Sequence, residues 1–327
     1  MKFSAQDAPH IRYPESTRAV MLDMVLCLLF LYAMAYYYYG IRALMLGAFS
    51  VLVCVIADML CVLFAGGRPN MRDLSPVITG MLIPLMMPAS VLFRMVLAAA
   101  VFAIVVAKHP FGGMGHNVFN PAAAGLSFAI ICFTGRLFAY PLPLTKLGFA
   151  LPAELLTTRS PGYTLNLGGI PKLDFVDMLL GNFSGPMGAT NILVILACLL
   201  FLVFRGTVHW STPLSFFATV CAFAFLFPRA DIAGLSSLHL EIMSGMLLFG
   251  GVFLLGDPVT SPKRLWSKVL YGIMAGILVM LFRRFGNLEE EFTFALLLMN
   301  AAVWGFDIIG ESLAGRIRRR KLEVLKD

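Results

Sequence analysis

Long apolar stretches separated by short polar segments make up most of this chain. An apolar segment of about 20 residues is long enough to cross the hydrocarbon layer of a membrane, which is roughly 30 Å thick. By this criterion the pattern predicts about ten membrane segments, with the approximate bounds 19–38, 41–65, 75–91, 93–107, 121–141, 189–206, 211–228, 236–256, 266–283 and 291–313.

Two of these segments contain residues that interrupt helices. The third contains Pro84 and Pro88, and a proline removes one backbone donor and clashes with the preceding turn. The eighth contains three glycines: Gly250, Gly251 and Gly256. We therefore expect both segments to be broken, or to enter the membrane and turn back.

Composition favours a membrane protein over a soluble one. Of the 327 residues, 59% are apolar and 13% are charged, whereas soluble domains carry roughly 25% charge. The first 18 residues do not resemble a cleaved signal peptide, so the first segment is expected to remain as a span. The cysteines lie in apolar stretches and are predicted to pack, not to form disulfides or bind a metal: Cys27, Cys54, Cys61, Cys132, Cys198 and Cys221.

The distribution of Lys and Arg predicts the orientation. If ten spans are crossed, most basic residues share the side of the N-terminus, which places both termini in the cytoplasm. The net charge of +7 then comes mostly from a basic tail facing anionic lipid, and a nucleic-acid partner is not expected. The predicted parts are a cytoplasmic segment 1–18, a first membrane repeat 19–141, an outer loop 142–188, a second membrane repeat 189–313 and a cytoplasmic tail 314–327.

Short matches between the two membrane parts indicate an internal repeat. Thr79-Gly80-Met81-Leu82 in the third segment corresponds to Ser244-Gly245-Met246-Leu247 in the eighth, and Phe111-Gly112 corresponds to Phe285-Gly286. Five spans per repeat would give the two repeats opposite orientations. The predicted fold is therefore an all-α polytopic membrane protein of two inverted five-helix repeats.

A loop rich in glycine and asparagine carries the strongest chemical signal. Gly112, Gly113 and Gly115 allow positive φ and close backbone approach, and amides of Asn117 and Asn120 can donate or accept. Such a loop suits a planar polar ring or an anion. The alternative is an ordinary connection between helices in which Asn120 caps the helix that begins at Pro121.

A second signal lies where the eighth segment ends, at Asp257-Pro258-Val259-Thr260. Its carboxylate and hydroxyl could hold a cation, cap the following helix or bind the ring nitrogens of a cofactor.

Charges inside apolar spans form the third signal, because they are costly there and often mark an ion or proton path. Asp58 and Asp307 are the candidates for such a path, and Arg94 and Glu241 are weaker ones that a position near a span end would make anchors.

Together these segments resemble the D subunit of the Rnf complex, a relative of the B subunit of the sodium-pumping NADH:quinone reductase. The likeness extends from Pro9 to about Asp307. It rests on the run from Lys108 to Ala122, on Asp73-Leu74-Ser75, on Asp257-Pro258-Val259-Thr260 and on Arg283-Arg284-Phe285-Gly286.

The resemblance implies a membrane subunit of a ferredoxin:NAD oxidoreductase that couples electron transfer to Na⁺ or H⁺ translocation. It implies a fold similar to urea transporters, other membrane and peripheral subunits as partners, and contact with ferredoxin and NAD only through them. It also implies two cofactors: FMN joined by a phosphoester to a hydroxyl of the outer loop, and noncovalent riboflavin in the membrane part. Asn117 and Asn120 would then face a flavin ring.

The expected attachment site departs from the family pattern, roughly Asp-Gly-x-Ser/Thr-x-Ala-Thr. The matching stretch is Glu154-Leu155-Leu156-Thr157-Thr158-Arg159-Ser160. Ser160 stands where the modified threonine is expected, and Arg159 replaces an alanine. The other candidate hydroxyls are those of Thr190, which follows Gly188-Ala189, and of Thr158 and Thr157. Loss of the covalent flavin is the remaining possibility.

Two classes of function remain open from the sequence. The favoured one is an electron-carrying subunit that is not catalytic alone. The alternative is a solute or ion channel without a redox role, which the similarity to urea transporters would also allow.

Overall fold

The computed structural model describes residues 16–68, 70, 73–152, 154–229, 234–286 and 289–324, with side chains to residue 313. Residues 1–15 of the expected cytoplasmic segment and the side chains of the expected basic tail lie outside this description. The first part of the chain forms α1 (Thr17–Tyr39), α2 (Ile41–Phe64), α3 (Ser75–Leu85), α4 (Phe93–Phe102), the π-helix η1 (Ala103–Lys108), the 3₁₀ helix η2 (His109–Phe111) and α5 (Pro121–Leu137).

The remainder is helical as well, apart from one short strand pair in the described residues. That pair joins β1 (Tyr140–Pro141) to β2 (Thr157–Thr158) in antiparallel fashion. The helices that follow are α6 (Pro161–Asn166), α7 (Phe175–Leu180), α8 (Ile192–Phe204), α9 (Ser211–Leu226), α10 (Gly234–Met243), α11 (Leu247–Phe253), α12 (Leu265–Phe285) and α13 (Phe292–Val324).

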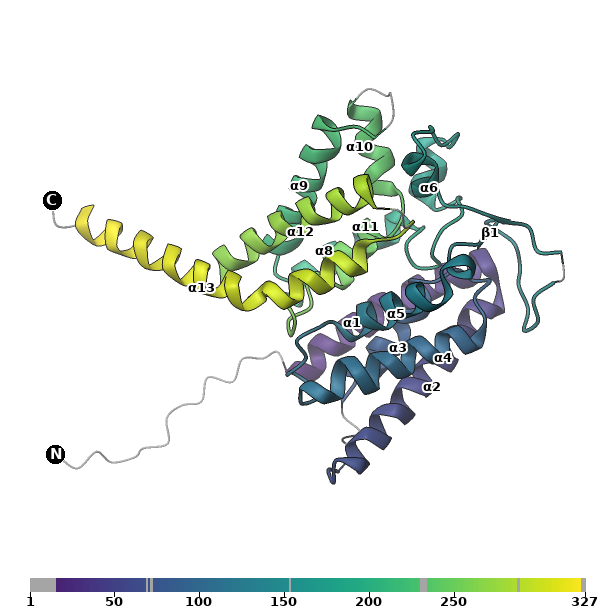
Figure 1. The fold of residues 1–327 in the computed structure, drawn as a ribbon, viewed down its shortest axis with the longest axis horizontal. Helices are drawn as coiled ribbons and strands as arrows, with labels where there is room; N and C mark the ends of the chain where they lie inside the picture. The colour runs from purple at the N-terminus through teal and green to yellow at the C-terminus, as the bar shows by residue number, and fades with distance from the viewer. Residues whose placement is uncertain are drawn as a thin grey trace.

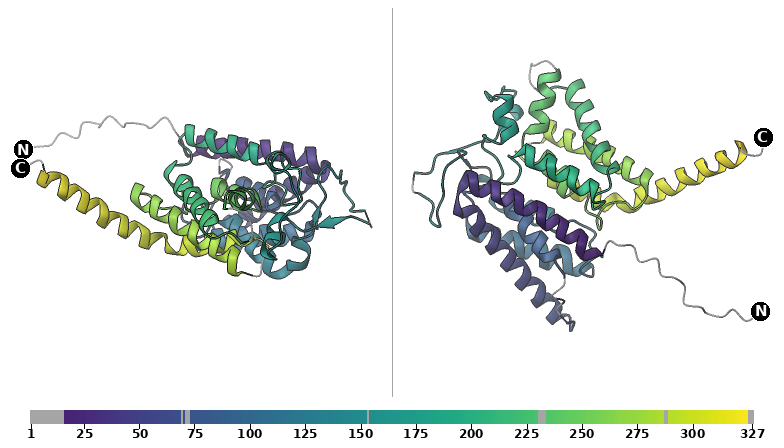
Figure 2. Two further views of the ribbon diagram at one scale, coloured as in Figure 1. Left: turned by 90° about the horizontal axis from the view of Figure 1, so that it is seen from above. Right: turned by 180° about the vertical axis from the view of Figure 1, so that it is seen from behind.

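The helices form two groups that lie side by side (Figure 1). One group is α1 to α5 and the other is α8 to α13, and the views in Figure 2 show the same division. We call the end where α1 begins and α13 projects the termini end. The opposite end, which carries β1, β2 and α6, is the loop end.

Every predicted membrane segment contains a helix. Within the described residues, five helical stretches are long and apolar enough to cross a membrane by themselves: Thr17–Tyr39, Ile41–Phe64, Phe93–Phe111, Leu265–Phe285 and Phe292–Leu313. The pair α10 and α11, bent by 58°, makes a sixth if it is counted as one span. The prediction of an all-helical membrane protein is confirmed, whereas the ten spans stay a prediction.

Local chemistry shortens the other helices. Pro84 lies in the last turn of α3. Since proline has no backbone N–H to donate, it favours the end of this helix at Leu85. The predicted break of the eighth segment is confirmed, although its position is wrong. The chain breaks at Ser244-Gly245-Met246, where Gly245 has a φ of +65°, a conformation that favours glycine. Gly251 lies inside α11, where an added Cβ would come within 2.8 Å of the Phe217 ring.

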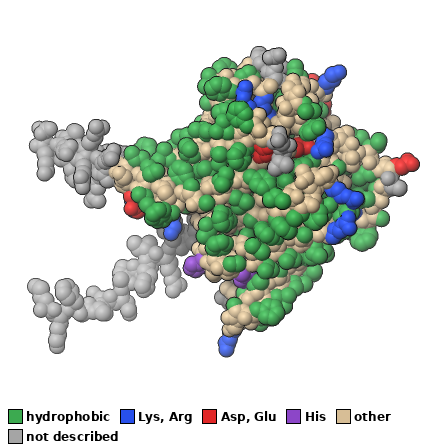
Figure 3. Space-filling view, viewed as in Figure 1, with side chains coloured by type: hydrophobic (Ala, Val, Ile, Leu, Met, Phe, Trp, Pro, Cys, Tyr) green, Lys and Arg blue, Asp and Glu red, His purple; other side chains and the backbone are tan. Residues whose placement is uncertain are grey.

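Small residues bring the helices into close contact, as is usual for membrane helices. A Cβ at Gly80 on α3 would lie 2.6 Å from Cα of Val51 on α2, and one at Gly125 on α5 would lie 2.5 Å from the Ala99 carbonyl oxygen on α4. Large apolar side chains cover most of the visible face (Figure 3), and others such as Leu200 and Phe204 on α8 are exposed as well. This surface suits contact with lipid or with other membrane subunits.

The two groups also meet through matching sequences. Cys27-Leu28-Leu29-Phe30-Leu31 on α1 is repeated as Cys198-Leu199-Leu200-Phe201-Leu202 on α8. The buried Cys198 thiol lies 3.8 Å from the carbonyl oxygen of Cys27, and all six cysteines are free thiols.

Candidate functional site

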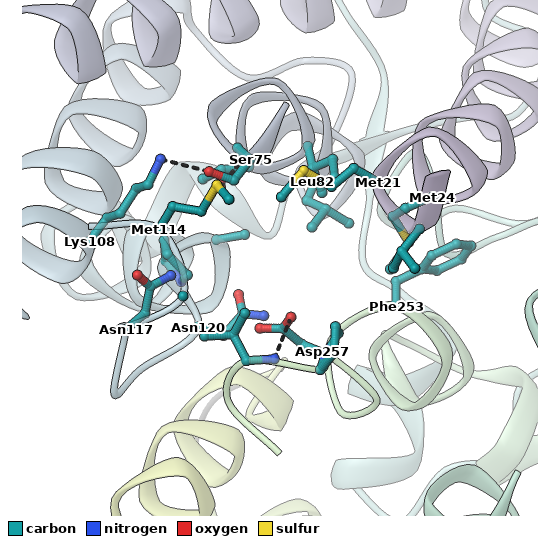
Figure 4. Close-up of a pocket in the computed structure, with 18 of the residues that line it drawn as sticks. Met21, Met24, Ser75, Leu82, Lys108, Met114, Asn117, Asn120, Phe253 and Asp257 are labelled. Atoms are coloured by element: carbon teal, nitrogen blue, oxygen red, sulfur yellow. Dashed lines mark hydrogen bonds between the residues drawn. The ribbon is translucent and has the colours of Figure 1, made fainter. Parts of the chain in front are cut away.

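Two loops that are far apart in the sequence meet across a cavity at the termini end (Figure 4). Gly115, Asn117 and Asn120 line one wall, and Asp257 lines the other. The cavity has a volume of about 140 Å³, and apolar side chains of α1, α3 and α11 complete it: Val20, Met21, Met24, Ile78, Leu82 and Phe253. The first and second chemical signals of the sequence therefore share one site.

Asn117 presents an unused acceptor at this site. Its Oδ1 atom is buried, and it has no hydrogen-bond partner among the described residues. The loop that carries it turns through Gly112, Gly113 and Gly115, with φ angles of +111°, +80° and +82°. A buried acceptor without a partner is unfavourable unless a ligand or water supplies the donor.

Asn120, in contrast, holds the protein together. Its Oδ1 accepts the N–H of Ala123 at 3.2 Å, so Asn120 caps α5. Its own N–H donates to Oδ1 of Asn300 on α13 at 3.0 Å. The Asn300 amide donates in turn to the Thr260 carbonyl at 3.2 Å. One side chain on α13 thus fixes both walls of the cavity.

Asp257 is held by its own loop. Its Oδ2 accepts from the Thr260 hydroxyl at 2.9 Å, and Oδ1 accepts from the Val259 N–H at 3.4 Å. Burial raises the pKa of this carboxyl above its usual value, and the hydrogen bond from Thr260 opposes that shift. Asp257 does not cap the next helix, because α12 begins after Arg264.

A charged group beside the cavity includes the first predicted ion-path residue. The Lys108 ammonium donates to Asp58 at 2.8 Å and to the Ser75 hydroxyl at 2.7 Å, and it lies 3.5 Å from Asp73. His109 Nε2 hydrogen-bonds the same Asp58 oxygen at 2.8 Å. We call these five residues the termini-end cluster. All of them except Ser75 border a second hollow of about 420 Å³, which Gly112 and Gly113 also line.

A second charged group, which we call the loop-end cluster, consists of Arg229, Glu241, Ser244, Arg283 and Glu290. Arg229 forms a two-pronged ion pair with Glu241. Arg283 donates to the Glu241 carboxylate at 3.3 Å and to the carbonyls of Glu241 and Ser244 at 2.8 and 2.7 Å. Glu290 accepts the N–H of Met246 at 3.0 Å at the start of α11. Burial raises the pKa of Glu290 to about 7.

The candidate attachment hydroxyls lie at the loop end, away from the cavity. Ser160 is fully buried, and its N–H donates to Glu289 at 2.8 Å. Thr157 and Thr158 are exposed on β2. Arg159 contacts Glu289 at 3.2 Å and lies over the Tyr163 ring. Thr190 is buried just before α8, beside Gly181.

The remaining charged candidates lie outside the cavity. Asp307 lies within α13, is partly buried and accepts the backbone N–H of Lys263 at 3.2 Å. Arg94 is exposed at the start of α4. Glu241 lies in the loop-end cluster.

Sequence reasoning missed the buried Arg42, whose Nη2 donates to the Val91 carbonyl at 2.8 Å. It also missed the contact of Lys108 with Asp58 and that of Glu290 with the Met246 N–H. These partners lie tens of residues apart, so no local spacing signals them. In the described residues, no group of three or more His, Cys, Asp and Glu could hold a metal ion.

Comparison with known proteins identifies relatives whose sequences match most of this chain. The chain is 29% identical over 307 residues to the D subunit of the Na⁺-translocating ferredoxin:NAD⁺ oxidoreductase complex of Acetobacterium woodii, covering 92% of each chain. It is 33% identical over 326 residues to the D subunit of the ion-translocating oxidoreductase complex of Stutzerimonas stutzeri, covering 88% of this chain and 89% of the relative. The D subunit of the proton-translocating ferredoxin:NAD⁺ oxidoreductase complex of Clostridium ljungdahlii is 27% identical over 311 residues, covering 91% and 92%.

The family-level comparison agrees with these relatives. The NQR2, RnfD, RnfE family matches residues 4–312, which include the cavity, both charged clusters and the candidate attachment segment. The chain belongs to the NQR2, RnfD, RnfE family.

Proposed function

We propose that this chain is the D subunit of an ion-translocating ferredoxin:NAD⁺ oxidoreductase complex of the Rnf type. Membership of the family and the names of the relatives carry this proposal. The D subunit passes electrons within the complex, coupled to movement of Na⁺ or H⁺, and it is not catalytic alone. Other subunits surround it in a bacterial membrane and contact ferredoxin and NAD. The termini end faces the cytoplasm. The channel alternative is set aside because the relatives are named as oxidoreductase subunits.

The cavity at the termini end holds a noncovalent flavin in this proposal. The unpartnered Asn117 oxygen suits an N–H of the isoalloxazine ring, and Asp257 offers a second polar contact. The volume of about 140 Å³ is below the usual range for ligand pockets, roughly 300–1,000 Å³. The flexible side chains of Met21, Met24 and Met114 line the cavity and can rotate to admit the ring. When bound, the flavin supplies one-electron chemistry, and the residues orient it and tune its potential.

A second flavin, FMN, is attached covalently to the segment 157–160 at the loop end. The hydroxyls of Thr157 and Thr158 are exposed, so a modifying enzyme can reach them in this conformation. The buried Ser160 hydroxyl requires the segment to open first. Arg159 supplies a cation beside any phosphoester formed here.

The two helix groups form inverted repeats in this proposal. Support comes from the repeated Cys-Leu-Leu-Phe-Leu sequence, whose two copies meet between α1 and α8. Further support comes from the breaks that follow Pro84 in α3 and precede Met246 at α11. Breaks of this kind are typical of inverted-repeat membrane proteins near the sites of ligands and ions.

The flavin proposal is tested by removing the unpartnered amide oxygen of Asn117. In the assembled complex, Asn117→Leu should empty or shift the absorbance of the noncovalent flavin and leave assembly unchanged. The exposed Asn182→Leu is the matched control. Unchanged spectra in Asn117→Leu would contradict the placement of a flavin in this cavity.

Covalent attachment is tested by mass spectrometry of peptides from residues 147–190 of the purified chain. The set Thr157→Val, Thr158→Val, Ser160→Ala and Thr190→Val identifies the hydroxyl, because one variant should lose both the added mass and the flavin fluorescence in a denaturing gel. A wild-type peptide set without added mass would remove covalent flavin from the proposal.

A further inference from the structure

Lys108 lies between the two hollows at the termini end. It lines the cavity of Asn117 and Asp257, and it also lines the hollow beside Asp58. Met114 also lines both hollows. Figure 4 shows the Lys108 ammonium bonded to Ser75 at the edge of the first cavity.

Within the described part of the chain, the partners of this ammonium group are side chains. They are Asp58 at 2.8 Å, Ser75 at 2.7 Å and Asp73 at 3.5 Å. Lys108 itself is 1% exposed, whereas the Asp58 side chain is 15% exposed and faces the second hollow. Because side chains can rotate while the backbone stays in place, Lys108 can exchange partners without unfolding a helix.

The charges of the cluster do not balance. Asp58 and Asp73 carry two negative charges, and Lys108 supplies one positive charge. His109 supplies another only when it is protonated. Arg68 lies at the exposed rim of the second hollow, and Asp257 faces Lys108 from the opposite wall of the first cavity. A cation beside Asp58 would therefore be more favourable when Lys108 turns away from Asp58 than when the two are paired.

We propose that Lys108 couples the charge state of the first cavity to cation binding at Asp58. The proposal rests on the function proposed above and assigns Lys108 as a positioning residue. An electron that enters the cavity from a reduced carrier of the complex oxidises that carrier by one electron and adds one negative charge to the cavity. Lys108 turns toward this charge. Asp58 then binds one monovalent cation from the termini end, so the net charge of the site is restored.

Linkage makes this coupling measurable. If a cation bound at Asp58 makes the addition of an electron to the cavity more favourable, the reduction potential of the flavin in the cavity must rise with the concentration of that cation. We would purify the assembled complex and titrate the flavin by absorbance over a series of NaCl concentrations and a series of pH values. The wild type should show a rising potential in one of the two series.

The variants separate coupling from structure. Lys108→Met should reduce the cation-dependent shift of the potential at least twofold, and Lys108→Arg should restore most of it. Asp58→Asn, which conserves volume, should abolish the shift. Lys172→Met, an exposed lysine of the loop between α6 and α7, is the matched control and should behave as the wild type.

An unchanged shift in Lys108→Met overturns the coupling. If that variant does not assemble, an unchanged shift in Asp58→Asn overturns it instead. A second readout is the melting temperature of the complex. It should rise with the same cation in the wild type and not in Asp58→Asn, and a rise in both counts against a site at Asp58. A wild-type complex without flavin in the membrane part would contradict the proposed function itself, which is a distinguishable result.

Discussion

The termini-end and loop-end clusters use the same kind of residue in different ways. Each contains a buried basic residue near the end of a long helical stretch, Lys108 in one and Arg283 in the other. In both cases Phe-Gly follows within four residues. Arg283 donates to two backbone carbonyls as well as to a carboxylate. The Lys108 ammonium donates to the side chains of Asp58 and Ser75. A basic side chain that donates hydrogen bonds to the backbone stabilises the fold around it, whereas one that donates only to other side chains can change partners.

The largest expected effect comes from removing the two bases in turn. Arg283→Met removes one donor from each of the carbonyls of Glu241 and Ser244 and one of the two cations of the Glu241 carboxylate. Breaking a buried pair of this kind costs about 3–5 kcal/mol. Lys108→Met leaves Asp58 with His109 and some exposure, so the expected cost is about 1–3 kcal/mol. Melting temperatures of the purified complexes measure both losses. Equal losses would contradict the distinction between the clusters.

A smaller effect is expected from pH. The pKa of Glu290 rises from 4.5 to about 7 in the folded chain because of burial. The folded state therefore holds this proton more tightly than the unfolded state does. The resulting stabilisation is complete below pH 4.5 and is lost as pH rises to about 7, with a magnitude of roughly 3 kcal/mol.

Glu290→Gln tests this dependence. The variant should lose most of the decline in melting temperature between mildly acidic and neutral pH, and it should melt above the wild type at alkaline pH. Glu311→Gln, which removes an exposed partner of Arg264, should keep the wild-type profile. A profile that is the same for Glu290→Gln and the wild type would assign the pH dependence to another group.

The smallest effect is expected from the weakest contact. Asp73→Asn removes a charge 3.5 Å from the Lys108 ammonium while retaining an oxygen for the Ser75 N–H, which Asp73 binds at 2.8 Å. The Ser75 hydroxyl, 3.0 Å from Oδ2, loses its carboxylate acceptor as well, so the stability should fall by about 1 kcal/mol. Glu241→Gln should cost several times more, because its carboxylate serves two buried arginines. A large loss in Asp73→Asn would mean that the termini-end cluster is as rigid as the loop-end cluster.

The sequence predicted the features that depend on neighbouring residues. Asn120 before Pro121 formed the expected helix cap, and the apolar segments formed helices in all ten places. The position of the second break depended on backbone geometry that glycine content alone does not specify, since Gly245 and not Gly250 or Gly251 adopts positive φ.

Long-range pairing could not be predicted in the same way. The Ser160 N–H donates to Glu289, 129 residues away. Arg229 and Glu241 pair with each other, and Arg283 on α12 and Glu290 before α13 join them in the loop-end cluster. These contacts depend on how the helices pack, and a single sequence contains no local period for them. Asp58 was identified as a charge within an apolar span, but its partner Lys108 lies 50 residues away.

Asn300 has a consequence for electron transfer. Its amide connects the asparagine loop to the aspartate loop, so the backbone of the two walls keeps a constant separation. A carrier bound between the two walls would therefore keep its position, and its distance to its redox partners would depend only on how the subunits are placed.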